Sequence, residues 1–593
     1  SIKPTWYSCG SRYKSAFITF IKSLFVEEIM AKLKGSLKIK LALGLVGEIQ
    51  RKKLKKASKN TKKSQEKILR QILEYAKDSE WGKNHNYAEI LTAKTADELF
   101  KKWQENVKPT DYEDIREFVE RHKHGEENVL FPGKPMMYAT TSGTTKEPKW
   151  IPITDQYYNN AYSKMTKLWL HSFQMHRPKV FENVCTSIVG KAIEGEAPDG
   201  TVCGSVSGVT RRDCPNFIKN LYAEDNAVFA ISDYKARYYT IMRTGIEKDV
   251  HLLVTANPST IVEMQNNVNE FFDEYVKDIE NGTLSQNIKI EPELREIIEK
   301  RFSPNPQRAK ELRELKEKYT NVLPKHYWPN IQVLTTWKCG NTHVYLDKFK
   351  DSFPEKMLHQ EFGYFASECR AGLVMNGKSD TVLFPHMNYF EFISDQDLEN
   401  PNPKFLQLHE LELGKRYCIY VTTFAGLYRY NMNDMIEVTG FYGTTPTIQF
   451  IQKINGIISL TGEKLHERQF IEAVRQAEKE TNLPTKFFVG FADIEQSTYH
   501  FYYEFADTSI DQAKAEEFTK VVDKNLKALN VEYLAKRDSF RVKDPITHLL
   551  QNESFETYKK RCIENGSRDG QFKLNLLMQD EKRHGMFKDL IKK

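Results

Sequence analysis

The sequence has few cysteines, and they are scattered along the chain. Its 593 residues include eight cysteines, and no two of them form a CxxC pair. A disulfide framework and a zinc finger both depend on regular cysteine spacing, so the pattern argues against both kinds of protein. Scattered cysteines are typical of reduced thiols, and we therefore expect a cytoplasmic protein.

The sequence also lacks an apolar run long enough to cross a membrane. Residues 16–30 are interrupted by three charged side chains, and the run at 41–47 is far shorter than the roughly 20 apolar residues that a span needs. Residues 16–30 weakly resemble the apolar part of a signal peptide, but no small-residue cleavage site follows them cleanly. We interpret residues 1–60 as a peripheral arm.

Acidic side chains are scarce near the N-terminus. Residues 1–72 contain 18 Lys and Arg but 4 Asp and Glu, whereas the remaining residues contain 69 and 76, so the net charge of +7 comes from this region. A solvated, partly helical arm is the simplest interpretation of the basic run at 51–63. The alternative is a contact of the arm with an anionic polymer or surface. We expect no nucleic-acid partner and consider a weak contact with an anionic membrane.

The length of the chain argues against a single hydrophobic core. After the basic arm at 1–60, we expect a large domain at 61–452 and a small domain at 453–593. Strand-like runs alternate with helical stretches up to about residue 400, and close-set antiparallel strands follow at 415–454. We predict a mixed α/β fold, in which helices flank the sheets of the large domain and the small C-terminal α+β domain is mobile. We expect a monomer.

Capping signals predict where two helices begin. Residues 110–125 start with Thr110, carry acids early and bases late, and end with Gly125. A second helix follows the run at 150–154, with Thr154 or Asp155 as its N-cap.

Hydroxyl side chains are concentrated in residues 140–150, TTSGTTKEPKW, directly after the apolar run PMMYA. Glycine permits close approach of the backbone, hydroxyl and N–H groups donate to phosphate oxygens, and lysine adds positive charge. The segment is therefore a candidate phosphate-binding loop. An ordinary solvated turn is the alternative, because clusters of Ser, Thr and Gly are usually loops.

A second candidate phosphate loop is GLVMNGKS at 372–379, which matches the Walker A pattern formally. That motif requires a helix immediately after it, because the helix N-terminus holds the phosphates. The following residues, DTVLFPHMNYFEFI, are aromatic, β-branched and interrupted by Pro385, and they predict a strand. We therefore reject a P-loop NTPase.

Three later stretches give the hydroxyl loop a context. They are FGYFASECRAGL at 362–373, GLYRYNMNDMIEVTGF at 426–441 and FIQKINGIISLTGEKLHE at 450–467. With ANPST, MNYFEF and the late GQFK at 570–573, this ordered series resembles the auxin-responsive acyl-acid amido synthetases, a hormone-conjugating branch of the adenylate-forming (ANL) superfamily. The resemblance extends from about residue 64 to residue 590, and it implies that the large domain at 61–452 is the ATP- and acyl-binding domain.

The resemblance implies a ligase that uses ATP and Mg²⁺ to convert a carboxylic acid to an acyl-adenylate and then passes the acyl group to an amino acid amine. It assigns the phosphate loop to Thr141, Ser142, Gly143, Thr144 and Thr145. It also implies that Glu368 holds magnesium, that Ser367 lies beside the α-phosphate and that Asp434 accepts the ribose hydroxyls. Tyr364 or Phe365 is then a candidate for stacking on adenine, with an ordinary core position as the alternative.

Two lysines are candidates for the cation at the transferring phosphate. By resemblance, Lys464 follows the interdomain hinge at 452–456 and Lys573 lies in GQFK; the alternative for each is a surface lysine. The family usually continues GQFK with Pro-Arg, whereas LNLL follows here. In the acid-binding region, Arg211 or Arg212 is a candidate partner for a carboxylate, although a basic surface position is the favoured interpretation. The sequence identifies neither the acid nor the amino acid.

Two other functions remain open. An acid:thiol ligase uses the same adenylate but delivers the acyl group to coenzyme A or a carrier thiol. A non-catalytic nucleotide-binding relative would use its basic arm for a partner. The presence of Ser367, Glu368, Asp434 and Lys464 favours an active enzyme.

Overall fold

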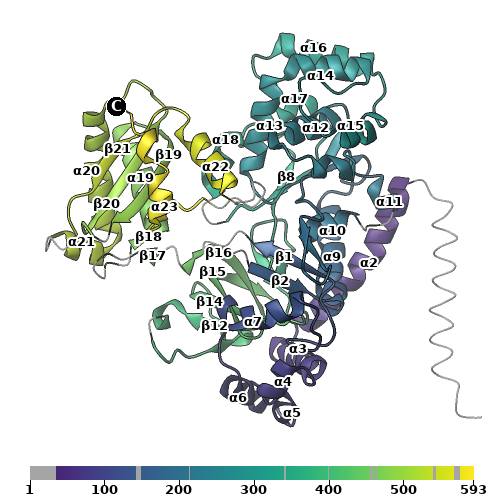
Figure 1. Cartoon of the computed structure of the whole chain (residues 1–593), viewed down its shortest axis with the longest axis vertical. Helices are drawn as coiled ribbons and strands as arrows, with labels where there is room; N and C mark the ends of the chain where they lie inside the picture. Colours follow the sequence, from purple (N-terminus) through teal and green to yellow (C-terminus); the bar gives the residue numbers. More distant parts are fainter. Residues whose placement is uncertain are drawn as a thin grey trace, which may run out of the picture.

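The computed structural model describes residues 35–141, 149–212, 214, 216–339, 342–398, 400–454, 457–458, 460, 463, 465–493, 495–538, 542–565 and 574–592. Their buried side chains form three large hydrophobic clusters. The first joins the N-terminal helices to strands between residues 364 and 448. The second lies between residues 228 and 353, and the third between residues 458 and 590, joined by Tyr345. They correspond to the lower, upper right and left parts of the molecule in Figure 1, and the predicted mixed α/β class is confirmed.

The largest sheet in the described part of the chain has eight strands in the order β13-β12-β14-β15-β16-β11-β10-β9, and its neighbours pair antiparallel. The strands are β9 (Tyr364–Phe365), β10 (Arg370–Val374), β11 (Thr381–Leu383), β12 (Tyr389–Ser394), β13 (Leu406–Gln407), β14 (Arg416–Thr422), β15 (Tyr430–Tyr442) and β16 (Thr445–Lys453). Residues 415–454 therefore form antiparallel strands, as predicted. Helix α3 (Thr61–Ala76) is fixed to this sheet by the Gln65 amide, which donates to the carbonyls of Pro385 and Asn388 at 2.9 Å each.

A parallel sheet forms the second part of the large domain. Its order is β3 (Val184–Ser187), β6 (Val250–Val254), β7 (Val333–Thr336) and β8 (Leu358–Glu361). The connections contain α10 (Val206–Arg212), α11 (Asn216–Lys219), α12 (Tyr234–Ile246), α13 (Ser259–Glu270), α14 (Phe272–Asn281), α15 (Pro292–Glu299), α16 (Pro306–Lys318), α17 (Pro324–Tyr327) and α18 (His343–Phe349). Parallel strands need such long crossovers, which explains the predicted alternation of strands and helices.

A third sheet has the order β2 (Lys149–Ile153), β1 (Met137–Thr141), β5 (Val202–Gly204) and β4 (Gly195–Glu196). It is preceded by α4 (Glu80–Asn84), α5 (Tyr87–Ile90), α6 (Ala96–Asn106) and α7 (Tyr112–Lys123). Strand β2 leads into α8 (Asp155–Tyr157), the π-helical turn η1 (Tyr158–Tyr162) and α9 (Ser163–His176). Because β1 and β2 are neighbours, both ends of the candidate phosphate loop lie at one end of this sheet.

The C-terminal part is built on the sheet β21 (Ile546–Leu549), β20 (Thr498–Phe505), β19 (Thr485–Asp493) and β22 (Leu577–Met578). Its helices are α19 (Glu467–Thr481), α20 (Gln512–Leu529), α21 (Val531–Asp538), α22 (Ser554–Glu564) and α23 (Glu581–Gly585), and the short pair β17 (Ile457–Ile458) and β18 (Leu465–His466) precedes them. Every residue of the aromatic strand β20 is buried, so both faces of the predicted hairpin β19–β20 are covered.

Helix α2 (Gly35–Ala57), which lies in the predicted basic arm, packs on α9. Leu43 and Leu54 are buried. The two helices approach so closely at Gly47 that a methyl group there would lie 2.2 Å from Cβ of His171. This part of the arm is therefore held against the large domain.

Two helices of the large domain contact the C-terminal part beside α22 (Figure 1). The ring of Tyr345 on α18 belongs to the C-terminal hydrophobic cluster and lies 6.1 Å from the ring of Phe555. Nζ of Lys559 is 3.9 Å from Oε1 of Glu263 on α13. Rotation of the small domain would have to break these contacts, and its mobility stays a prediction.

Of the two predicted helix N-caps, the one at Thr110 is wrong. Asp111, not Thr110, caps α7 through a capping box, because the Thr110 hydroxyl donates instead to the Tyr428 carbonyl at 2.8 Å. Thr154, one of the two residues predicted as the second cap, is the N-cap of α8, and its side chain accepts a hydrogen bond from the N–H of Tyr157. The formal Walker A segment at 372–379 is followed by strand β11, so the helix that the motif requires is absent from this described segment.

Candidate active site

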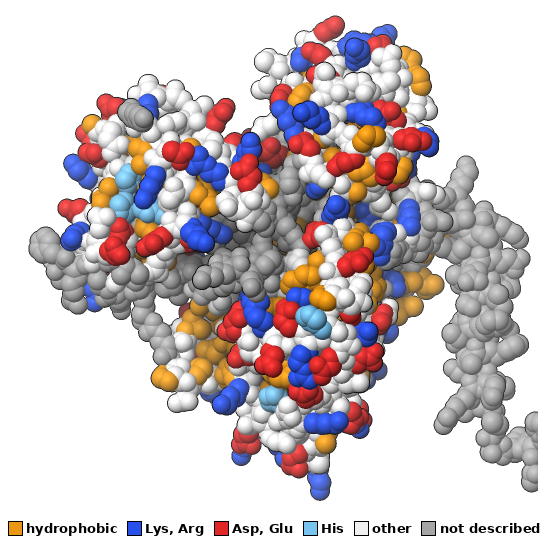
Figure 2. Space-filling view, in the orientation of Figure 1, with side chains coloured by type: hydrophobic (Ala, Val, Ile, Leu, Met, Phe, Trp, Pro, Cys, Tyr) orange, Lys and Arg blue, Asp and Glu red, His pale blue; other side chains and the backbone are white. Residues whose placement is uncertain are grey.

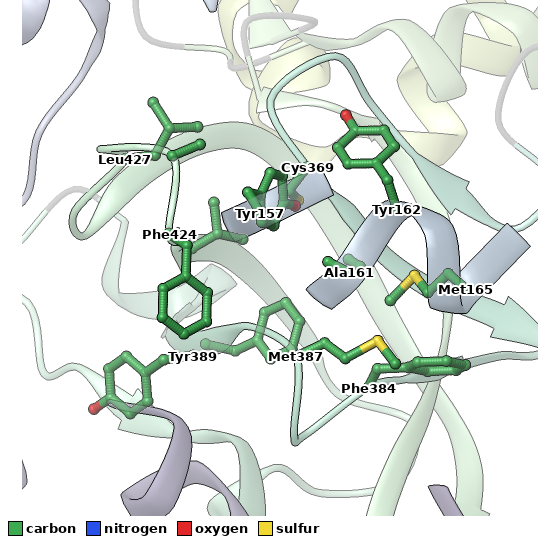
Figure 3. Close-up of a cluster of buried hydrophobic side chains, with 14 of the residues drawn as sticks. Tyr157, Ala161, Tyr162, Met165, Cys369, Phe384, Met387, Tyr389, Phe424 and Leu427 are labelled. Carbon is green, nitrogen blue, oxygen red and sulfur yellow. The ribbon is translucent and has the colours of Figure 1, made fainter. Parts of the chain in front are cut away.

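The turn between β9 and β10 carries Ser367 and Glu368, both half-buried. Next to them, Cys369 is fully buried. Figure 3 shows Cys369 beside Tyr157 and near Tyr162, in the cluster that lies beneath the turn. The Tyr162 hydroxyl donates to the Ser367 carbonyl at 3.4 Å. A buried aromatic layer thus supports the turn that presents the two polar side chains.

Tyr364 on β9 and Asp434 on β15 are joined by a hydrogen bond. The tyrosine hydroxyl donates to Oδ2 of Asp434 at 2.5 Å, and the two residues are 7% and 4% exposed. Burial raises the pKa of Tyr364 well above its ordinary value, and the charge of Asp434 raises it further, so the hydroxyl keeps its proton. The Glu368 carboxylate also raises this pKa. Asp434 on β15 is therefore held against β9, the strand that leads directly into the turn with Ser367 and Glu368.

The backbone before Asp434 is in a left-handed conformation. Asn433 has φ 57°, a region that Asn enters more readily than most residues. The register of β15 also shifts directly after Met435. Asn433 can therefore hold the left-handed backbone turn that comes directly before Asp434.

The base of the hydroxyl-rich loop is linked to β15. Thr141 pairs with Lys149 at the ends of β1 and β2, and the N–H of Trp150 donates to the Tyr112 hydroxyl at 2.7 Å. Tyr112, on α7, closely follows Thr110, which forms an isolated β-bridge with Tyr430 at the start of β15. The described ends of the loop are thus connected to the strand that carries Asp434. Ser142, Gly143, Thr144 and Thr145 lie outside the described residues.

Lys464 and Lys573 also lie outside the described residues, but their neighbours meet. The Glu467 carboxylate, three residues after Lys464, accepts the N–H of Leu576 at 2.7 Å. Burial raises the pKa of Glu467 to about 8. The segments that follow the two lysines are therefore joined on one edge of the C-terminal part.

Phe365 faces away from the Tyr364–Asp434 pair. Its ring lies 5.9 Å from Trp169 on α9 and 5.2 Å from Phe362. Consecutive residues of a strand point to opposite faces, which explains the separation. The adenine-stacking role of either aromatic stays a prediction.

The favoured interpretation placed Arg211 at the protein surface, and this prediction is wrong. Arg211 is 4% exposed, its Nη2 lies 3.4 Å from Oε2 of Glu224, and its guanidinium covers the ring of Tyr222 at 3.9 Å. Because Arg211 already has a carboxylate partner, it is a structural residue in this arrangement.

Sequence reasoning did not assign a role to Arg370. This residue is buried beside Tyr162 and Phe365, directly after the turn that carries Glu368. A signal was present in the sequence, because a single cation interrupts the otherwise uncharged run CRAGLV.

Comparison with solved structures identifies the class of this fold. The GH3.15 acyl acid amido synthetase superimposes with a TM-score of 0.77 at 21% identity, over 91% of this chain and 95% of that chain. The same protein in complex with 2,4-DB gives a TM-score of 0.79 at 20% identity, over 92% and 96%. The fold is that of the acyl acid amido synthetases.

Family models match most of the chain. They are the GH3 family N-terminal domain at residues 50–358, the central domain at 381–453 and the C-terminal domain at 468–582. The chain therefore belongs to the GH3 family, and the predicted acid–amino acid ligase class is confirmed.

Two relatives illustrate the range of the family. Indole-3-acetic acid-amido synthetase GH3.4 of Arabidopsis thaliana is 24% identical over 88% of this chain and 90% of its own. Jasmonoyl-L-amino acid synthetase JAR4 of Nicotiana attenuata is 27% identical over 71% and 74%.

Proposed function

We propose that the protein activates a carboxylic acid with ATP and transfers the acyl group to an amino acid amine. A carboxylate oxygen attacks the α-phosphorus of ATP, the bond to the bridging oxygen breaks, and pyrophosphate leaves. The amine nitrogen then attacks the acyl carbon, AMP leaves with the bonding electron pair, and the amine loses a proton. One observation carries the proposal: within a GH3 fold, the buried Asp434 carboxylate accepts the hydroxyl of Tyr364, which lies four residues before Glu368.

The proposal gives a role to each polar residue on or near the Tyr364–Asp434 hydrogen bond and to the candidate phosphate loop. Asp434 accepts the ribose hydroxyls, and Tyr364 holds its carboxylate in one orientation. Ser367 and residues 141–145 contact the phosphates with hydroxyl and backbone N–H groups.

A magnesium ion fits the donor set. Glu368 is a half-buried carboxylate on a turn, and the described residues contain no cluster of three metal-ligating side chains. Mg²⁺ is commonly held by one or two carboxylates together with substrate phosphates, so Glu368 would hold the ion with the phosphates of ATP. The bound ion would neutralise phosphate charge.

The acceptor is tested by supplying both kinds of nucleophile. The full chain is incubated with ATP, an acid panel and either the twenty amino acids or coenzyme A, and the products are measured by mass spectrometry. The names of the relatives suggest indole-3-acetate and jasmonate as the first acids. An acyl-amide with stoichiometric AMP supports the proposal, whereas an acyl-thioester as the sole product contradicts it and favours the acid:thiol ligase.

The two lysines lead to a separate prediction. Lys464→Ala and Lys573→Ala are each tested. If one of these lysines supplies the cation at the transferring phosphate, its alanine variant should release pyrophosphate about 100-fold more slowly than the wild type. The reason is that a preorganised cation at this phosphate contributes several kcal/mol. Stopped-flow detection of acid-dependent pyrophosphate release measures the effect. Lys479→Ala, at the end of α19, is the matched control and should retain the wild-type rate. Wild-type rates in both test variants would remove the assignment.

We also propose that α2 mediates the weak membrane contact considered for the arm. Leu41, Leu45 and Ile49 are 49%, 55% and 44% exposed on one helix face. Lys52 and Lys53 are exposed in the following turn, which matches anionic lipid in charge. In Figure 2 hydrophobic side chains gather at the right of the surface, where Figure 1 shows α2. None of the helices in the described part of the chain has the length and apolarity needed to span a bilayer.

Vesicles containing phosphatidylserine test this contact. The triple variant Leu41→Ser, Leu45→Ser and Ile49→Ser should co-sediment with these vesicles at least about tenfold less than the wild type at low salt. Each of the three apolar side chains contributes about 1.5 kcal/mol or more when it is buried. Ile297→Ser, at another exposed apolar side chain, is the control and should bind like the wild type. Equal binding by the triple variant, or none by the wild type, contradicts the proposal. The monomeric state and the cytoplasmic location stay predictions.

A further inference from the structure

Arg370 is a buried cation held between two aromatic rings. It is 9% exposed, and its guanidinium carbon lies 4.7 Å from the ring centroid of Tyr162 and 4.6 Å from that of Phe365. Nη1 also donates to the hydroxyl of Thr166 on α9. These contacts fix the position of the guanidinium but supply no negative charge.

Other buried arginines of this chain have a carboxylate partner within 3.4 Å. These pairs are Arg211–Glu224, Arg243–Glu247, Arg429–Glu391 and Arg537–Asp523. Across the described ranges, by contrast, no Asp or Glu forms an ion pair with Arg370, whose contacts are with aromatic rings and a hydroxyl. A buried cation without an anion is costly, and such charges are usually paired or used by a ligand.

The position of Arg370 indicates on which side of the sheet a ligand would meet its guanidinium. Arg370 is the cross-strand partner of Phe365 and stacks on its ring. Phe365 points to the opposite face of β9 from Tyr364, whose hydroxyl binds Asp434. The guanidinium therefore lies on the α9 side of the strand and not on the side proposed for the ribose. It is also only two residues from Glu368, the proposed magnesium ligand.

We propose that Arg370 binds a carboxylate of the acyl acid in a subsite between β10 and α9. A guanidinium presents a fork of N–H donors that matches the two oxygens of a carboxylate. This inference rests on the proposed function, because it places an acid next to the adenylation site. The anion is either the reacting carboxylate or a second carboxylate of a dicarboxylic acid. Arg370 would bind both in the same way. Pairs of a monocarboxylic acid and the corresponding dicarboxylic acid distinguish the two cases.

Arg370→Met tests the assignment, because methionine keeps an unbranched side chain without the charge. The full chain and the variant are compared by ATP–pyrophosphate exchange with hexanoate and adipate, benzoate and terephthalate, and indole-3-acetate. The KM for acid should rise by about 30-fold or more, as expected for the loss of a charge-assisted bidentate contact, while the KM for ATP stays within about twofold. A loss for every acid identifies the reacting carboxylate, and a loss confined to the diacids identifies a second one. An unchanged KM for all acids overturns the inference.

Stability provides a second readout that a merely structural arginine would not give. Without ligand, Arg370→Met should unfold at the same temperature as the wild type or higher, because the uncompensated cation has been removed. Benzoate at 20 mM should raise the unfolding temperature of the wild type but not of the variant, and benzamide should raise neither. A variant that unfolds at a lower temperature and still responds to benzoate would contradict the inference.

Arg243→Met is the matched control. Arg243 is also buried but is paired with Glu247 at 2.6 Å, on α12 in a different hydrophobic cluster. Its replacement should lower the unfolding temperature and leave the KM for acid unchanged. Absence of exchange with every acid in the wild type would instead disprove the proposed function, while the benzoate-dependent shift would still report on Arg370.

Discussion

Glu368→Gln is expected to reduce acid-dependent pyrophosphate release by about 100- to 1,000-fold, because the amide removes the charge that Mg²⁺ requires while keeping the shape of the side chain. The apparent affinity for Mg²⁺ should fall in parallel. Single-turnover pyrophosphate release at a series of Mg²⁺ concentrations measures both quantities.

Glu437→Gln is a suitable control for Glu368→Gln. Glu437 lies on β15, where its carboxylate forms a partly exposed ion pair with Arg416 at 3.0 Å. Exposed pairs of this kind contribute little, so we expect the wild-type rate within about twofold. If Glu368→Gln retained both the rate and the Mg²⁺ dependence of the wild type, Glu368 would not be the magnesium ligand.

Asp434→Ala is expected to raise the KM for ATP by about 100-fold, since it removes an ionised acceptor for two ribose hydroxyls. It also leaves the buried Tyr364 hydroxyl without its carboxylate acceptor, which should cost about 1–3 kcal/mol of unfolding free energy. Steady-state kinetics and thermal unfolding measure the two effects separately.

The ribose contact itself is tested with 2′-deoxyATP. The wild type should prefer ATP because Asp434 accepts the 2′-hydroxyl, whereas Asp434→Ala should lose most of this preference. Tyr364→Phe is the matched variant, as it keeps the Asp434 carboxylate and removes the hydroxyl that orients it. It should weaken ATP binding less than Asp434→Ala. The same preference for ATP in all three proteins would show that Asp434 does not contact the ribose.

Local sequence signals predicted the elements but only some of their ends. The antiparallel strands at 415–454 and the hairpin β19–β20 followed from alternating apolar residues and turn residues. The N-cap of α7 was assigned to Thr110 because its hydroxyl is a good cap, but a carbonyl 318 residues away in sequence takes that hydroxyl. Such a competition is a tertiary effect, and a local pattern cannot reveal it.

In the candidate site, too, local sequence patterns predicted some features, while others depend on tertiary contacts. The ordered motifs singled out Glu368 and Asp434, while the hydrogen bond of Asp434 to Tyr364 depends on how β9 and β15 are placed in one sheet. Arg211 was expected at the surface because charged residues are mostly exposed, but Glu224 pairs with it in the interior. Arg370 received no role because its lack of a carboxylate partner is visible only when its surroundings are known.

The central claim is that this chain forms an acyl-adenylate, and ATP–pyrophosphate exchange tests it most directly. The full chain is supplied with MgATP, labelled pyrophosphate and a broad panel of carboxylic acids, each compared with its amide. We predict exchange that requires the free acid and that is strongly reduced in Glu368→Gln and, at ATP concentrations near the wild-type KM, in Asp434→Ala. If nucleotide binds but no acid in the panel supports exchange, the chain does not make an adenylate, and a non-catalytic nucleotide-binding protein becomes the better description.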